Sequence, residues 1–121
     1  MVDERIVFTA LHARNYEATV SFYRDVVGVP LEEEEHGDEC PHFEYSWQEP
    51  YFPFAIFPLK PDEDPTHVEL SFNNSNVADV HSRALSAGIQ VVRAPGRRPW
   101  GLSAEYIDPD GNAVGVTELT S

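Results

Sequence analysis

Residues 100–116 decide the fold, and they read Trp-Gly-Leu-Ser-Ala-Glu-Tyr-Ile-Asp-Pro-Asp-Gly-Asn-Ala-Val-Gly-Val. Two short runs that are typical of strands flank the segment from Asp108 to Asn112, in which proline fixes φ and the Asp-Gly and Gly-Asn pairs tolerate a positive φ. The pattern predicts a β-hairpin that closes a sheet. It also fixes the register of the last strand, where Gly115 lies three residues after Asn112.

Upstream of this hairpin, the chain contains the same arrangement of elements twice. One helix is predicted from Asn15 to Gly28 and a second from Asn76 to Gly88, each with asparagine as N-cap and glycine at the C′ position. The two caps are 61 positions apart and the two glycines 60. This spacing indicates an internal duplication.

Strands are predicted around each helix. In the first half they cover residues 5–11, 31–35, 43–48 and 54–59, and in the second half 67–72, 90–94, 103–108 and 113–118. Each half is therefore β-α-β-β-β, and a polar, proline-bounded segment at 60–65 joins them. We expect an α+β fold in one domain, residues 1–121, with a first module at about 1–60 and a second at about 61–121. Neither half can bury its helix and its sheet alone, so the two should share one core.

Composition excludes several classes of function. The 121-residue chain carries a formal net charge of -13, which disfavours binding to nucleic acid or to an anionic membrane. It has no apolar run near the roughly 20 residues that span a bilayer. The start of the chain lacks the features of a signal peptide, so a cytoplasmic location is expected. The single cysteine, Cys40, cannot form an internal disulfide.

Three segments together resemble a known family. Residues 15–31 read Asn-Tyr-Glu-Ala-Thr-Val-Ser-Phe-Tyr-Arg-Asp-Val-Val-Gly-Val-Pro-Leu, and residues 67–72 read His-Val-Glu-Leu-Ser-Phe. With the turn at Asp108–Asn112, they resemble the glyoxalase / bleomycin-resistance / extradiol-dioxygenase family, the vicinal oxygen chelate superfamily. The resemblance covers essentially the whole chain. It implies two βαβββ modules that form a cupped mixed sheet with helices on the outer face, often completed by dimerisation.

The resemblance also implies ligand positions for a divalent metal, which enzymes of this family hold with His and Glu. On this sequence the first-strand position is Phe8, the fourth-strand segment at 54–57 offers no acidic residue, the fifth-strand position is His67, and the last-strand position is Gly115. A lone imidazole does not hold a catalytic metal, so the site is predicted to be metal-free and without a cofactor. The alternative is one divalent transition metal at a relocated site formed by His12, His67 and Glu69.

Aromatic residues then become the main candidates for a small-molecule pocket. Three rings alternate along one predicted strand, and His67 and Glu69 share the strand face that should line the cup. Glycine at 115 leaves room for a ligand. The predicted ligand-binding residues are Phe8, Phe43, Tyr45, Trp47, Phe54, His67, Glu69, Trp100 and Gly115. Ordinary core or dimer-interface packing remains an alternative for the rings, as does a His–Glu pair or solvated polar side chains for residues 67 and 69.

Three functional hypotheses follow. The first is a metal-free homodimeric binding protein that holds a small aromatic or cationic molecule, similar to the drug-sequestering branch linked to antibiotic resistance. The second is a metal-dependent lyase, isomerase or dioxygenase with displaced ligands, and the third is a catalytically silent scaffold. The histidines at 36, 42 and 81 are interpreted as surface residues, and Gly96–Pro99 as a basic loop at the groove edge.

Overall fold

A computed structural model describes residues 4–35 and 40–118 of the chain. Its elements are β1 (Thr9–Ala13), α1 (Tyr16–Ser21), η1 (Phe22–Val27), β2 (Glu32–Glu34), β3 (His42–Gln48), β4 (Tyr51–Pro58), β5 (Glu69–Asn73), α2 (Val77–Ser86), β6 (Gln90–Arg98), β7 (Gly101–Ile107) and β8 (Ala113–Glu118). They form two four-stranded sheets, ordered β1-β4-β3-β2 and β5-β8-β7-β6. In each sheet the first pair is parallel and the others are antiparallel. The predicted α+β fold of two βαβββ modules is confirmed.

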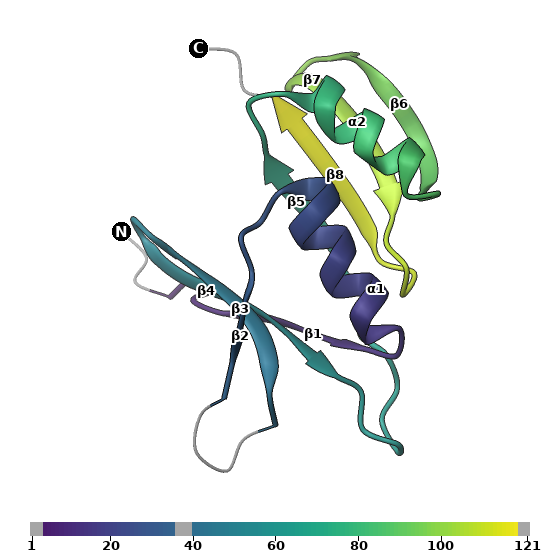
Figure 1. Cartoon of the computed structure of the whole chain (residues 1–121). Helices are drawn as coiled ribbons and strands as arrows, with labels where there is room; N and C mark the ends of the chain where they lie inside the picture. The colour runs from purple at the N-terminus through teal and green to yellow at the C-terminus, as the bar shows by residue number, and fades with distance from the viewer. Residues whose placement is uncertain (1–3, 36–39, 119–121) are drawn as a thin grey trace.

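The first helix is the centre of the molecule. α1 runs directly into η1, whose π-helical spacing ends at Gly28, and the combined segment lies between the two sheets in Figure 1. Tyr23 is fully buried there, with its ring 5.4 Å from Phe54 of the first sheet and 5.8 Å from Phe72 of the second. The two modules therefore share one hydrophobic core, as neither could supply it alone.

Each sheet buries one face and leaves the other open. Along β5, Leu70 and Phe72 pack against the core, whereas Glu69, Ser71 and Asn73 are exposed. The same alternation follows from the two-residue period of any strand. Because the helices cover the buried faces, both open faces point away from the shared core.

The second module supplies the caps of the first helix. At its N-terminus, Asp110 accepts hydrogen bonds from the backbone N–H groups of Arg14 and Asn15, at 3.0 and 2.9 Å. At its C-terminus, Asn74 Nδ2 donates to Val27 O and Arg83 Nε to Val26 O, both at 3.1 Å. A helix leaves these terminal groups without intrahelical partners, and a cation beside the last carbonyls also suits the helix dipole.

A buried carboxylate completes this connection. Asp108 is 3% exposed and accepts hydrogen bonds from Tyr23 Oη at 2.7 Å and from Asp110 N, Asn112 N and Asn112 Nδ2, each at 2.8 Å. Burial, with the neighbouring charge of Asp108, raises the pKa of the Tyr23 hydroxyl well above its ordinary value, so that hydroxyl stays protonated and donates. The turn that sequence patterning identified is thus tied directly to the first helix.

The largest differences between the predicted and observed element boundaries are at the start of β1 and the end of β6. The first strand was expected at 5–11, but β1 begins at Thr9, and the apolar side chains of Ile6 and Val7 are exposed. Gly96–Arg98 was expected in a loop, but it belongs to β6, where irregular pairing with β7 lets the strand continue. In both places local composition was a poor guide, because pairing with a neighbouring strand sets the ends.

Candidate functional site

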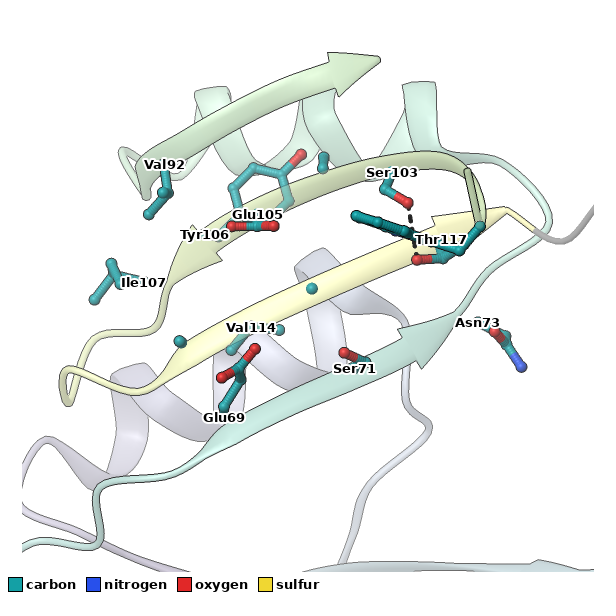
Figure 2. A pocket seen from close by; sticks show the side chains of 14 residues that line it. Glu69, Ser71, Asn73, Val92, Ser103, Glu105, Tyr106, Ile107, Val114 and Thr117 are labelled. Atoms are coloured by element: carbon teal, nitrogen blue, oxygen red, sulfur yellow. Dashed lines mark hydrogen bonds between the residues drawn. The ribbon is translucent and has the colours of Figure 1, made fainter. Parts of the chain in front are cut away.

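The open face of the second sheet carries a groove of about 540 Å³ (Figure 2). β5, β6, β7 and β8 all contribute to it, together with the β6–β7 turn. The residues that line the groove are Glu69, Ser71, Asn73, Val92, Trp100, Ser103, Ala104, Glu105, Tyr106, Ile107, Ala113, Val114, Gly115 and Thr117. A cavity of this size accommodates a drug-sized molecule.

Strand register arranges the groove in rows. In the middle row, Ser71, Gly115 and Glu105 are paired side by side across β5, β8 and β7. In the next row, two residues further along β8, Thr117 is paired with Asn73 on β5 and Ser103 on β7. The Ser103 and Thr117 hydroxyls are 3.0 Å apart. The rows present hydroxyl, amide and carboxylate groups on one surface.

Gly115 is the residue of the middle row that has no side chain. Its φ is not positive, so backbone conformation does not require glycine there. A Cβ at this position would lie 3.2 Å from Ser71 Oγ, which is closer than ordinary van der Waals contact. With no side chain at this position, the strand backbone itself lines the groove between Ser71 and Glu105.

The groove is acidic. Its lining includes the carboxylates of Glu69 and Glu105 and, among the described residues, no lysine, arginine or histidine. Arg93 is paired with Glu105 across β6 and β7, with 3.9 Å between Nε and Oε2. Both side chains are substantially exposed, so the ion pair is weak. The chain's net charge of -13 adds to the negative potential. A cation is the charge type that this surface attracts.

Trp100 provides the exposed aromatic side chain of the groove. It lies two residues after the end of β6, lines the groove and remains 58% exposed. Glu69, Trp100 and Gly115 are therefore the three predicted site residues that the structure brings together.

The aromatic strand lies elsewhere. Phe43, Tyr45 and Trp47 do share one face of β3, but they pack against the core on the helix-covered side, not beside Trp100. The expectation of one pocket formed by these four rings is therefore not met within a single chain. Packing these rings against the core removes apolar surface from water, which stabilises the fold. The same packing leaves less of each ring accessible to a ligand.

Trp47 and Phe54 line a second cavity of about 290 Å³, which we call the wedge. It lies between the two sheets, with lining residues from β1, β3, β4 and β5, and Ser71 and Asn73 contribute to both the wedge and the groove. The full lining is Thr9, Trp47, Phe52, Phe54, Leu70, Ser71, Phe72 and Asn73. Of the predicted aromatic residues, Trp100 therefore lines the groove and Trp47 and Phe54 line the wedge, whereas Phe43 and Tyr45 line neither cavity.

Phe8 and His67 do not line the groove or the wedge. Phe8 is 48% exposed just before β1, and His67 is exposed just before β5. Both residues precede the first residue of a strand. The position of a residue relative to the helix cap therefore did not predict which side chains surround it.

Sequence reasoning missed a polar cluster on the open face of the first sheet. His42 was interpreted as a surface residue, but it is 1% exposed, with Nε2 3.0 Å from Glu44 Oε1. The Phe57 ring stacks with His42 at 4.3 Å and with His12 at 5.3 Å. The alternation of His42, Glu44 and Ser46 was the available signal. His81 is half-buried and bonds the Tyr106 hydroxyl at 2.8 Å, and His36 lies outside the described residues.

The residues at the implied metal positions do not fit a metal ion. Phe8 and Gly115 offer no donor atom, and the buried β4 segment at 54–57 has only apolar side chains. Within residues 4–35 and 40–118, no three His, Cys, Asp or Glu side chains group closely enough to hold a metal. The relocated set is divided as well, because His12 stacks on Phe57 of the first sheet while Glu69 lies in the groove.

The fold and groove are those of two-module proteins with a cupped sheet, and sequence comparison names the class. Residues 5–116 match the family model of the Glyoxalase/Bleomycin resistance protein/Dioxygenase superfamily, so the chain belongs to this superfamily. A search of curated proteins found no match.

Similar solved structures include proteins of different activities. TnmS3, an antibiotic binding protein from Streptomyces sp. CB03234, has a TM-score of 0.73 at 21% identity, with 99% of each chain covered. Virulence protein STM3117 from Salmonella typhimurium has a TM-score of 0.69 at 23% identity, covering 99% of this chain and 100% of that one. A lactoylglutathione lyase from Agrobacterium tumefaciens has a TM-score of 0.64 at 24% identity, covering 98% and 96%. At these identities the likeness establishes the fold alone.

A separate finding concerns membranes. No helix in the described part of the chain has the length and apolar character needed to cross a bilayer.

Proposed function

We propose that this protein binds a small cationic or aromatic molecule in the groove of its second sheet, without a metal ion and without chemical conversion. The observation that carries the proposal is the composition of the groove: two carboxylates and an exposed tryptophan surround the space above Gly115, with no cationic side chain in the described lining. Drug sequestration is the activity that this arrangement favours, and TnmS3 is described as binding an antibiotic. A cation that lies over the indole ring and beside the carboxylates is stabilised by a cation–π interaction and by electrostatic attraction.

The charge of the groove provides the direct test. We expect the Glu69→Gln/Glu105→Gln double variant to bind proflavine, a planar aromatic cation, about tenfold more weakly than the unmodified protein, measured by fluorescence anisotropy at fixed salt. The Glu17→Gln/Glu32→Gln variant removes the same charge from exposed positions away from the groove and is the matched control. An equal loss of affinity in both variants would show that net charge alone attracts the dye.

The proposal requires no bound metal. Purified protein is expected to contain less than about 0.1 equivalents of Fe, Mn, Ni, Zn or Cu by mass spectrometry, because a lone imidazole does not retain these ions. One equivalent that survives dialysis and disappears in His67→Ala would overturn the metal-free proposal and favour the metal-dependent enzyme.

We also propose that the chain forms a homodimer. Two sheet faces are open in one chain, and large apolar side chains are exposed near them: Ile6 at 79%, Val7 at 57%, Tyr51 at 61% and Trp100 at 58%. Such surface is rarely left uncovered in a monomer. Light scattering at micromolar concentration is expected to give twice the 13.6 kDa mass of the chain. A monomer mass would contradict this proposal but leave the groove proposal intact.

A further inference from the structure

The wedge has an aromatic wall to which both modules contribute. Trp47 and Phe54 come from the first sheet and Phe72 from the second, with ring centroids 6.0 to 6.5 Å apart. Phe52 completes the wall. These separations are typical of interacting rings, and a planar group that enters the wedge would meet several ring faces and edges.

Hydrogen-bonding groups of the backbone also face the wedge. β5 is the edge strand of its sheet and pairs only with β8. Val68 O accepts from Ala113 N and Asn74 N donates to Thr117 O, so even-numbered residues of this segment direct their backbone groups toward β8. In a parallel ladder alternate residues face opposite sides. Ser71 and Asn73 therefore direct their N–H and C=O groups toward the open edge, where the wedge lies.

The two cavities meet along this edge. Ser71 and Asn73 line both of them, and Figure 2 shows their side chains on the open face of β5 in line with Glu69. A molecule in the groove that extends across β5 therefore passes from carboxylates, over backbone amides, to aromatic rings. Each part of that path has its own complementary chemistry.

We infer that one ligand occupies both cavities, and that its class is an aromatic amide with a cationic arm. The cationic arm lies in the groove near Glu69 and Glu105, the amide pairs with the open edge of β5, and the aromatic ring enters the wedge. This inference rests on the proposed function for its cationic part only. The aromatic part stands on the wedge and is tested separately.

The two tryptophans of the chain report on different sites, because Trp100 lines the groove and Trp47 lines the wedge. Trp47 also lines a cavity next to Pro50, and the wedge-filling variant described below distinguishes the two. Protein labelled with 5-fluorotryptophan gives one ¹⁹F signal for each, assigned with Trp47→Phe. The probe is Nα-benzoyl-L-argininamide. Nα-benzoyl-L-citrullinamide removes only its charge, and Nα-acetyl-L-argininamide removes only its ring. We expect the probe to shift both signals with one half-saturation concentration and to bind about tenfold more tightly than either control compound.

A variant that fills the wedge completes the test. Thr9→Phe places a ring in the wedge lining, and it is expected to remove the tenfold advantage of the benzoyl compound over the acetyl compound. Its affinity for acetyl-argininamide should not change. A shift of the Trp100 signal alone, or a benzoyl advantage that persists in Thr9→Phe, would overturn the two-cavity inference and leave cation binding in the groove. A shift of the Trp47 signal alone would overturn both this inference and the proposed function, as would no shift at all.

Discussion

Replacement of Asp108 by alanine is expected to lower the free energy of unfolding by about 3–5 kcal/mol. The carboxylate accepts four hydrogen bonds in a site that is 3% exposed, and its removal leaves the buried Tyr23 hydroxyl and three N–H donors without their acceptor. A domain of this size has a total stability of about 5–15 kcal/mol, so a large part of it would be lost. Urea denaturation followed by tryptophan fluorescence measures the change.

Two further variants show whether the buried network is responsible. Tyr23→Phe removes one of the four donors and is expected to cost about 1–2 kcal/mol. Asp62→Ala removes an exposed carboxylate from the linker between the modules and should change stability by less than about 0.5 kcal/mol. If Asp108→Ala were no less stable than Asp62→Ala, the network at the turn would not hold the modules together.

Gly115→Leu is expected to weaken binding of proflavine by about 100-fold. Gly115 is paired between Ser71 and Glu105, and a leucine side chain would fill the space that its missing Cβ leaves in the groove. The fold should be retained, because the backbone conformation at this position suits any residue. Anisotropy titration measures the affinity, and thermal unfolding without ligand measures the stability.

Local crowding must be separated from obstruction of the ligand. Because a Cβ at 115 would lie 3.2 Å from Ser71 Oγ, Gly115→Ala and the Gly115→Ala/Ser71→Ala double variant are the appropriate controls. Gly115→Ala adds only a methyl group to the groove, and the double variant also removes the Ser71 hydroxyl that crowds it, so both should bind proflavine within about threefold of the unmodified protein. Unchanged affinity in Gly115→Leu would place the ligand outside the groove.

The duplicated modules and the final hairpin were predictable from sequence because local rules determine them. Asp108–Asn112 contains the turn residues, and Gly28 has the positive φ of +100° that its place after the helix predicts. The two predicted asparagine caps show that local rules do not determine every hydrogen bond. Asn76 does cap its helix, accepting from Asp79 N at 3.1 Å, but the Asn15 side chain donates to Pro109 O and Asp110 Oδ1. Only the fold could reveal that long-range partner.

The site was less predictable for a related reason. Alternation along a strand tells which side chains share a face, and it correctly grouped Phe43, Tyr45 and Trp47. It does not tell which face the helix covers, because that depends on packing between distant segments. The position of Gly115 on the last strand follows from a turn that ends three residues before it, whereas the wedge is lined by residues of both sheets, and no local pattern encodes that arrangement.

The caps of the first helix have a consequence for the history of the duplication. Both ends of this helix depend on groups from the other half: Asp110 at one end, Asn74 and Arg83 at the other. Protection of the helix amides against exchange with solvent then depends in part on contacts between the halves, so we expect the slowly exchanging region to extend across the duplication. An ancestral half-length chain would have needed a second copy of itself to supply the same caps. Gene fusion would have made that association permanent and then allowed the two halves to diverge.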